Sequence, residues 1–281
     1  MTGPVLRSDG CIEAVGRLRL CYRTWETAQP TAALVLVHGL AEHAGRYAGF
    51  GEAMAGAGVS TFALDLRGHG ASDGRRGYVR RFDVFLQDLD RFRREVQGLV
   101  EPRCPLFLFG HSMGGLIAVR YLEEYEGAFR GAVIASPWLA TAVRVPRWKM
   151  HLAHLLDRAL PALPMKAGIR PEHLSHDPQV VADYRDDPLV HGTITPRLFV
   201  EASHAMALAF QRSDRIAVPL LFLLAGRDHI VETERTLAFA RALRGAHAVR
   251  VFPESFHEVL NEPDRPAAVA EVRDWLRAYL E

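Results

Sequence analysis

Residues 104–116 read Cys104-Pro-Leu-Phe-Leu-Phe-Gly110-His-Ser112-Met-Gly114-Gly-Leu116. This order of a short apolar run, a G-x-S-x-G motif and a second apolar run predicts a strand that ends, and a helix that begins, within one residue of Ser112. The serine would then lie on a strained turn with its hydroxyl exposed, while Gly110 and Gly114 keep side chains away from the crowded backbone. A bare G-x-S-x-G occurs often by chance, so it is the surrounding pattern that indicates Ser112 as a nucleophile.

Short apolar runs alternate with amphipathic helical segments along most of the chain. This alternation is typical of a mostly parallel central sheet with helices on both faces. Together with the turn at Ser112 it predicts an α/β protein with the α/β-hydrolase fold. An opening antiparallel hairpin is expected at 11–15 and 18–25, and buried strands at 33–38, 59–64, 106–109, 132–135, 220–224 and 248–252. Helices are expected at 46–57, 82–100, 113–126, 233–243 and 266–280.

Residues 137–212 break this alternation, because the stretch is far longer than a crossover helix needs. Prolines separate amphipathic segments such as 152–163 and 198–210, and the leucine content is too high for a disordered insertion. The stretch therefore predicts a helical cap, or lid, inserted over the sheet. Residues 1–136 and 213–281 would form the hydrolase core.

Composition excludes several classes of protein. The 281 residues are 49 % apolar and 24 % charged, which is ordinary for a globular domain. A formal net charge of +1 lacks the basic excess of a nucleic-acid binder. We therefore expect no nucleic-acid partner, and no obligate protein partner is evident.

The sequence predicts a cytoplasmic protein. Residues 1–10 lack the apolar centre of a secretory signal, and no apolar run is long enough to span a bilayer. The three cysteines are an odd number and suggest no disulfide framework. Cys11 and Cys21 could approach each other across the hairpin, but two free thiols in a reducing compartment is the favoured interpretation.

A nucleophilic serine needs a base to take its proton and an acid to orient that base. In the α/β-hydrolase fold the acid follows the serine, and the histidine comes last. Asp228 lies just beyond the strand expected at 220–224, and His257 lies between the last strand and the final helix. The neighbouring Asp214 precedes its strand and His229 adjoins the acid, so both fit less well. The predicted catalytic residues are Ser112, Asp228 and His257.

The oxyanion of the tetrahedral intermediate needs two backbone donors. The fold supplies one from the residue after the nucleophile, here Met113, and another from the loop after an early strand, here Leu40. His38 precedes that loop and is expected to support it. The chain has no HExxH, CxxC, Walker A or Rossmann signature, so neither a metal nor an organic cofactor is expected.

Three stretches of the chain resemble the monoacylglycerol lipase and lysophospholipase branch of the α/β-hydrolases. They are His38-Gly-Leu-Ala-Glu42-His-Ala-Gly-Arg46-Tyr47, Asp65-Leu-Arg-Gly68-His-Gly70-Ala-Ser72-Asp-Gly74 and Gly110-His-Ser-Met-Gly-Gly115. The stretches 174–178 and 184–192 are similar to that family's cap, and 257–262 to its histidine loop. The resemblance runs from about residue 11 to the C-terminus.

The resemblance implies a serine hydrolase that cleaves monoacylglycerol to glycerol and a fatty acid through an acyl-enzyme intermediate. Glu42, Arg46 and Tyr184 match positions near the polar, glycerol-side end of the family's substrate pocket. A structural ion pair with a packed tyrosine is an equally good interpretation of these three residues.

A lipid ester also suits the cap, because an apolar tunnel gains about 0.8 kcal/mol for each methylene it buries. The segment 144–150 mixes cationic residues with Trp148 near the start of the cap. One interpretation is that it rests transiently on a membrane or micelle surface. The other is a solvated face of the cap, which the shortness of the segment favours.

Three alternatives stay open. The same machinery would serve a lysophospholipase or a broad-specificity carboxylesterase. A peptidase is disfavoured, because no carboxylate cluster is evident that would hold a free amino terminus. A hydrolase-fold binding module without turnover belongs to a different class, and labelling of Ser112 by an organophosphorus probe would argue against it.

Overall fold

An eight-stranded sheet forms the centre of the protein, whose computed structural model describes residues 4–142 and 146–280. The strand order is β1-β2-β4-β3-β5-β6-β9-β10, antiparallel between β1 and β2 and between β2 and β4, and parallel elsewhere. The strands are β1 (Leu6–Glu13), β2 (Arg19–Glu26), β3 (Ala32–Val37), β4 (Val59–Leu64), β5 (Leu106–His111), β6 (Gly131–Ala135), β9 (Leu220–Ala225) and β10 (His247–Phe252). The predicted mostly parallel α/β sheet is confirmed.

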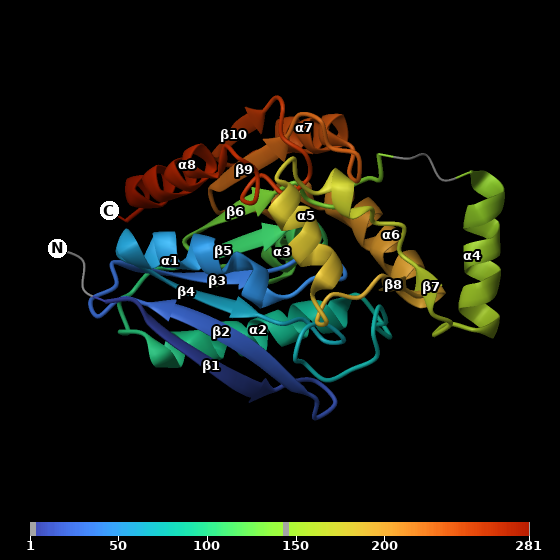
Figure 1. Cartoon of the computed structure of the whole chain (residues 1–281), viewed down its shortest axis with the longest axis horizontal. Helices are drawn as coiled ribbons and strands as arrows, with labels where there is room; N and C mark the ends of the chain where they lie inside the picture. Colours follow the sequence, from blue (N-terminus) through green and yellow to red (C-terminus); the bar gives the residue numbers. More distant parts are fainter. Residues whose placement is uncertain (1–3, 143–145, 281) are drawn as a thin grey trace.

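Helices cover both faces of the sheet. The side chains of each strand alternate between the two faces, so each face has its own apolar cluster. Val35 and Val37 pack in one apolar cluster with α2, α3, α6 and α7, whereas Leu34 and Leu36 pack in a second cluster with α1 and α8. The helices α1 and α8 lie side by side (Figure 1). Their bounds are α1 (Ala48–Gly56), α2 (Asp83–Leu99), α3 (Met113–Glu124), α6 (Pro196–Gln211), α7 (Thr233–Ala242) and α8 (Arg265–Ala278).

Expected and observed bounds differ mainly at the first strand and the first helix. β1 begins at Leu6 rather than at 11, since it pairs with β2 along its full length while most of its side chains are exposed. An exposed strand carries no apolar alternation that would mark its start. The short 3-10 helix η1 (Ala44–Tyr47) precedes α1, which therefore begins at 48 rather than 46. Cys11 and Cys21 are directly opposed in the β1–β2 pair, and both are free thiols.

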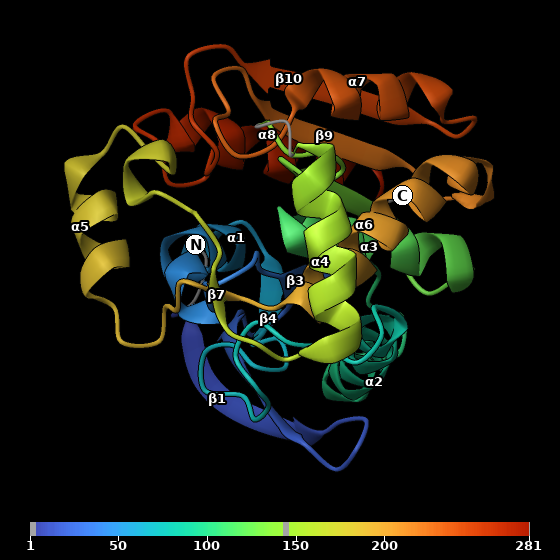
Figure 2. The ribbon, with the colours of Figure 1, turned by 90° about the vertical axis from the view of Figure 1, so that its right-hand side faces the viewer.

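Residues 137–212 hold several short elements between β6 and β9. These are α4 (Arg147–Ala159), β7 (Met165–Lys166), the 3-10 helix η2 (Pro171–His173), α5 (Pro178–Asp186), β8 (Thr193–Ile194) and α6, with β7 and β8 forming a separate small sheet. Helix α4 ends before 163 because Pro161 disfavours helical backbone at the residue before it. Figures 1 and 2 show α4 at the periphery of the molecule, beyond α6.

Helix α6 joins the part of the chain predicted to be the cap to the hydrolase core. Leu198, Ala202 and Ala209 of α6 are fully buried in the same apolar cluster as Leu116 of α3. The division into a core and an inserted cap stays a prediction, and α6 is the element whose packing crosses it.

We expect Gly114→Ala to destabilise the fold by about 3 kcal/mol, because the added Cβ would collide with the carbonyl oxygens of Val37 and His38. The matched control is Gly98→Ala in α2, where nothing lies within 4 Å of the new atom. The control should gain about 0.5–1 kcal/mol from the better helix propensity of alanine. Urea unfolding of the two variants checks this, and equal stabilities would contradict it.

Candidate active site

Ser112 lies between the last residue of β5 and the first residue of α3, on a backbone with φ +52° and ψ −116°. This region is unfavourable for a residue with a side chain. Neighbouring backbone fixes the turn: the Ser112 N–H donates to Ala135 O over 3.0 Å, and its carbonyl accepts from Trp138 N–H over 2.9 Å. A Cβ at Gly110 would collide with the carbonyl of Gly114, so the close approach of strand and helix requires glycine here.

Asp228 and His257 form a buried hydrogen-bonded pair. His257 Nδ1 lies 2.7 Å from Asp228 Oδ2, while Asp228 Oδ1 accepts from the backbone N–H groups of Ile230 and Val231 at 2.8 and 2.9 Å. The carboxylate orients the ring and places the proton on Nδ1, which leaves Nε2 free to act as a base.

The pKa values of Asp228 and His257 are set by their burial and by the attraction between them. Burial alone would lower the pKa of His257, but the Asp228 carboxylate reverses the effect and raises it above its ordinary value. Burial alone would likewise raise the pKa of Asp228, yet His257 and the two amides lower it. The ring of His111, 4.7 Å from that of His257, has a pKa lowered to about 4, chiefly by burial, and so stays neutral beside it.

Ser112 and His257 line the same cavity, although no hydrogen bond joins their side chains among the residues that the structure describes. A hydroxyl and base in an unliganded site are often further apart than in the reacting complex. The cavity has a volume of about 20 Å³, which is room for about one water molecule. Its other lining residues are Gly39, Leu40, Glu42, His111, Ile169, Leu174, Tyr184, Ile230 and Glu258.

Of the two predicted oxyanion donors, Leu40 lines this cavity and Met113 directly follows Ser112. Met113 is the first residue of α3, so its N–H has no partner within the helix. Leu40 follows Gly39, where a Cβ would stand 3.1 Å from Ser112 Cβ. Neither N–H donates to another group within residues 4–142 and 146–280. Ala41, in the same loop as Leu40, is also strained, with φ +69°.

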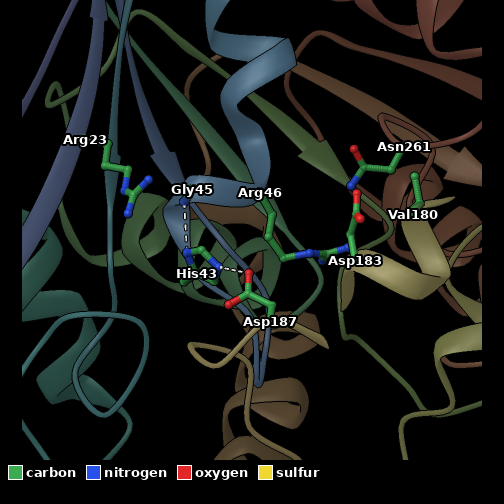
Figure 3. Close-up of a pocket in the computed structure, with 8 residues that line it drawn as sticks. All are labelled: Arg23, His43, Gly45, Arg46, Val180, Asp183, Asp187 and Asn261. Atoms are coloured by element: carbon green, nitrogen blue, oxygen red, sulfur yellow. Dashed lines mark hydrogen bonds and ion pairs between the residues drawn. The ribbon is translucent and has the colours of Figure 1, made fainter. Parts of the chain in front are cut away.

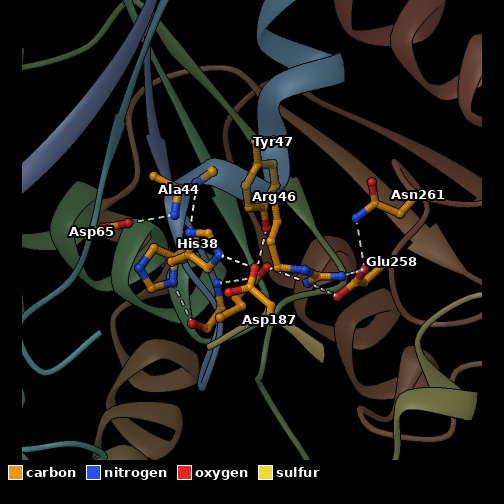
Figure 4. Close-up of polar contacts among 12 residues, drawn as sticks. His38, Ala44, Arg46, Tyr47, Asp65, Asp187, Glu258 and Asn261 are labelled. Carbon is orange, nitrogen blue, oxygen red and sulfur yellow. Dashed lines mark hydrogen bonds and ion pairs between the residues drawn. The ribbon is translucent and has the colours of Figure 1, made fainter. Parts of the chain in front are cut away.

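Glu42 and Arg46 belong to a buried ion-pair network (Figure 4). Arg46 donates to Glu42 Oε2 at 2.8 Å and makes a two-pronged contact with Glu258 at 2.5 and 2.7 Å. Its guanidinium also lies 4.7 Å from the centre of the Tyr184 ring. The predicted structural ion pair with a packed tyrosine is therefore present, while Glu42 and Tyr184 also face the cavity at Ser112.

The sequence analysis assigned no role to Glu258 or Tyr47, which complete this network. The Tyr47 hydroxyl donates to Glu42 Oε1 at 2.9 Å, and Glu258 holds Arg46 from the loop that carries His257. Glu258 directly follows His257 in sequence, and that adjacency was the signal that could have identified it.

Arg46 also lines a second cavity, of about 390 Å³ (Figure 3). His43 joins η1 to the segment after α5 there, since its Nε2 lies 2.8 Å from Asp187 Oδ2. The cavity is lined by Arg23, His43, Gly45, Arg46, Val180, Asp183, Asp187 and Asn261. Over the described part of the chain, no group of three or more His, Cys, Asp or Glu side chains is arranged to hold a metal ion.

Comparisons with known proteins show the family to which the chain is similar. The family described as "Serine aminopeptidase, S33" matches residues 28–264. The chain is 32 % identical over 281 residues to a monoacylglycerol lipase of Mycolicibacterium smegmatis, covering 98 % of each, and 25 % identical to the phospholipase YtpA of Bacillus subtilis, covering 92 % of this chain and 99 % of that one. Its structure is similar to the solved monoacylglycerol lipase of Paleococcus ferrophilus, with a TM-score of 0.81, 30 % identity, and coverage of 99 % of this chain and 100 % of that one.

We expect Arg46→Met to destabilise the protein by about 4 kcal/mol at pH 8, because it leaves Glu42 and Glu258 buried without a counter-charge. Burial alone would raise the pKa of Glu42, and Arg46 is the main group that holds it at about 2. Without Arg46 that pKa rises, so the deficit should shrink as the pH falls from 8 to 5 and the carboxylate takes up a proton. Denaturant unfolding at both pH values checks this.

The matched control is Arg185→Met, which removes an exposed pair with Glu172. We expect no measurable change in its unfolding midpoint, since exposed ion pairs are screened by solvent. A deficit of Arg46→Met that stayed constant between pH 8 and 5 would show that the buried carboxylates are not its cause.

Proposed function

The chain belongs to the serine aminopeptidase S33 family and, within the α/β-hydrolases, to the monoacylglycerol lipase branch, and from this premise we propose that it hydrolyses monoacylglycerol to glycerol and a fatty acid. The observation that carries the proposal is the strained Ser112, which lines one cavity together with His257, the partner of Asp228, and with Leu40. That is the arrangement which acyl transfer to serine requires.

In this proposal Ser112 Oγ attacks the ester carbonyl while His257 Nε2 takes its proton. Asp228 holds the imidazole in the required tautomer and stabilises the imidazolium. The amides of Leu40 and Met113 bind the oxyanion. His257 then protonates the departing glycerol oxygen, and afterwards activates a water molecule that releases the fatty acid from the acyl-enzyme.

An apolar groove beside the nucleophile supports a long acyl chain as part of the substrate. It has a volume of about 510 Å³ and begins at Trp138, whose N–H donates to the Ser112 carbonyl. Its apolar wall consists of Trp138, Leu139, Met150, Phe199, Met206 and Phe210. At about 0.8 kcal/mol for each buried methylene, such a surface favours long chains over short ones by several kcal/mol.

Because the cavity at Ser112 is small, the proposal also gives a role to the predicted cap. Ile169, Leu174 and Tyr184 close it from residues 137–212. An ester group cannot enter about 20 Å³, so these side chains have to move when substrate binds.

Two other activities, those of a lysophospholipase and of a peptidase, would differ from monoacylglycerol hydrolysis in the leaving group. A lysophospholipase would use the same machinery, and the phospholipase among the relatives supports it as the alternative. A peptidase that binds a free amino terminus needs a carboxylate whose oxygens are free to accept from the amine. Glu42 and Glu258, the carboxylates at this cavity, already accept from Arg46, and their oxygens also accept from Gly39, Tyr47 and Asn261. We therefore expect peptide amides to be left uncleaved.

We expect fatty-acid release from monoacylglycerols, with turnover rising as the acyl chain lengthens, and its loss in Ser112→Ala. The assay compares monoacylglycerols of increasing length with di- and triacylglycerol and lysophosphatidylcholine. Preference for lysophosphatidylcholine would transfer the assignment to the alternative, and residual hydrolysis by Ser112→Ala would refute the nucleophile. Wild-type protein that neither turns over any ester nor reacts with an organophosphorus probe would instead be a binding module.

The pH profile tests the proposed base. Because the raised pKa of His257 keeps the ring protonated up to a higher pH, kcat/KM should fall as the pH decreases through a value above 6.5. Asp228→Asn removes the attraction that raises this pKa, so the acidic limb should move to lower pH while kcat drops by about 10⁴-fold. Ester hydrolysis between pH 5 and 9 checks both effects. An acidic limb unmoved by the substitution would contradict the assignment.

We further propose that α4 rests on a lipid surface while substrate enters. Trp148 and Leu155 are each 62 % exposed, and with Leu152 they follow the i, i+4, i+7 spacing of one helix face. Lys149 lies beside Trp148 and can face anionic lipid. Residues 144 and 145 of the predicted cationic segment lie outside the described residues. Within those residues, no helix has both the length and the apolarity needed to cross a bilayer.

Trp148→Ala with Leu155→Ala should lower turnover of vesicle-embedded monoacylglycerol about tenfold, and leave a water-soluble short ester unaffected. Removal of two interfacial side chains weakens only the first reaction. The control is Leu99→Ala, which removes an apolar side chain of α2 that is 50 % exposed. Equal effects on both substrates would argue for an ordinary solvated face.

A further inference from the structure

We propose that Cys11 and Cys21 form a dithiol site, at which exchange with a low-molecular-weight disulfide such as oxidised glutathione closes a reversible Cys11–Cys21 disulfide. The two residues are directly opposed in the antiparallel β1–β2 pair, and both are free thiols. The site belongs to the opening hairpin of the sheet, and its chemistry is separate from the ester hydrolysis proposed for Ser112. Either proposal can therefore fail without the other.

Backbone hydrogen bonds show which kind of cross-strand pair the two cysteines form. The Cys21 N–H donates to Ser72 Oγ over 2.8 Å, and the Cys21 carbonyl accepts from the Asp65 N–H over 2.8 Å. Both groups therefore point away from β1, toward the other side of β2. Cys11 and Cys21 are thus a non-hydrogen-bonded pair, the kind in which opposed Cα atoms are about 4.5 Å apart and the side chains are closest.

This separation suits a disulfide. The Cα atoms of linked cysteines are roughly 4.4–6.8 Å apart, so a non-hydrogen-bonded pair lies at the short end of the permitted range. Directly opposed side chains of an antiparallel pair also extend from the same face of the sheet. A bond between the two sulfurs therefore requires rotation of the side chains while the strands keep their register.

The register that opposes the two cysteines is fixed on both sides of them. Toward the turn, the Ala14 N–H donates to Leu18 O over 2.8 Å. Toward the other end of β1, the hydroxyls of Ser8 and Thr24 share a hydrogen bond of 2.8 Å. A slip by one residue would break both contacts and turn one strand's side chains to the other face. The hairpin therefore holds the two thiols together.

Cys11 is the thiol that reacts first. Its side chain is exposed, whereas Cys21 is half-buried and its Sγ donates to Ala71 O over 3.5 Å. Burial, together with the neighbouring Cys11, raises the pKa of Cys21 to about 12, so Cys21 is a protonated thiol at neutral pH. Because the thiolate is the attacking species in thiol–disulfide exchange, the reaction begins at Cys11.

The exchange has two balanced steps. Cys11 Sγ loses its proton to solvent and attacks one sulfur of oxidised glutathione, whose S–S bond breaks as a mixed disulfide forms and one glutathione thiolate leaves. Cys21 Sγ then attacks Cys11 Sγ, and the second glutathione leaves with the proton that Cys21 gives up. The dithiol loses two electrons and two protons, and oxidised glutathione is reduced to two thiols.

Closure fastens an edge strand to the sheet. Strand β1 is the first in the strand order, pairs with β2, and exposes most of its side chains. A strand with so few buried contacts opens locally at little cost in free energy. A disulfide at the hairpin restricts that opening. Because the bond is exposed, thiols can reduce it again, which makes the fastening reversible.

Peptide mapping tests the site directly. Reduced wild-type protein is incubated with oxidised glutathione, alkylated, digested and analysed by mass spectrometry. We expect the peptides of Cys11 and Cys21 to be joined, with the loss of two hydrogen atoms, and dithiothreitol to restore both thiols. Cys104, the third cysteine, is the internal control and should not be joined to another cysteine of the chain.

Matched variants separate the two steps. In Cys21→Ser the exchange should stop at the mixed disulfide between Cys11 and glutathione. In Cys11→Ser we expect Cys21 to stay a free thiol, because it is half-buried and protonated. Amide hydrogen exchange of β1 should slow about tenfold in the oxidised wild type and remain unchanged in Cys11→Ser treated in the same way.

Three results would overturn the proposal. They are a wild-type protein that stops at the mixed disulfide, one that joins Cys11 residues of two chains, and one whose hairpin thiols stay free while the same protein is oxidised in denaturant. Ester hydrolysis is measured on the same samples. Absence of Ser112-dependent turnover in the reduced wild type would refute the proposed function and leave the dithiol site intact.

Discussion

The buried guanidinium of Arg46 connects three parts of the site that are far apart in sequence. It pairs with Glu42 in the loop that carries Leu40, with Glu258 in the loop that carries His257, and with the face of Tyr184 in α5. A buried charge is tolerated only when its partners satisfy it completely. Arg46 therefore connects the loop of Leu40, the loop of His257 and α5 to one another.

The strained turn at Ser112 depends on a second constraint, the packing of α3 on the centre of the sheet. Strand β5 lies between β3 and β6, so backbone from both sides confines the turn. A residue in this conformation costs about 1–3 kcal/mol and persists only where the surroundings hold it. Buried apolar side chains pack on both faces of the sheet around this turn. This packing holds Ser112 in a backbone conformation that would be unfavourable in a flexible chain.

The groups proposed to react and the groove proposed to bind the acyl chain lie in different parts of the chain. The groups proposed to act on the ester belong to the hydrolase core, whereas Ile169, Leu174 and Tyr184 close the cavity from residues 137–212. The apolar groove combines side chains from the segment after β6 with others from α6. Under the proposed function, changes in residues 137–212 would therefore alter the acyl chain accepted while the proposed reacting groups keep their geometry.

The sequence by itself predicted the sheet, the turn at Ser112 and the loops that carry Leu40, Asp228 and His257. Those features depend on local patterns: apolar runs for buried strands, glycines where backbones approach, and the chain order of the fold. The catalytic roles remain predictions of that analysis.

Only the tertiary structure decided how the cap is built and what the polar residues contact. Helix α5 and the β7–β8 pair are short, and segments of that length are held by packing rather than by propensity. The pairing of Arg46 with Glu258 spans 212 positions, and His38 accepts a hydrogen bond from the backbone of Leu66. Local sequence specifies elements through the side chains they bury, whereas a buried polar group is defined by partners that the fold brings from elsewhere in the chain.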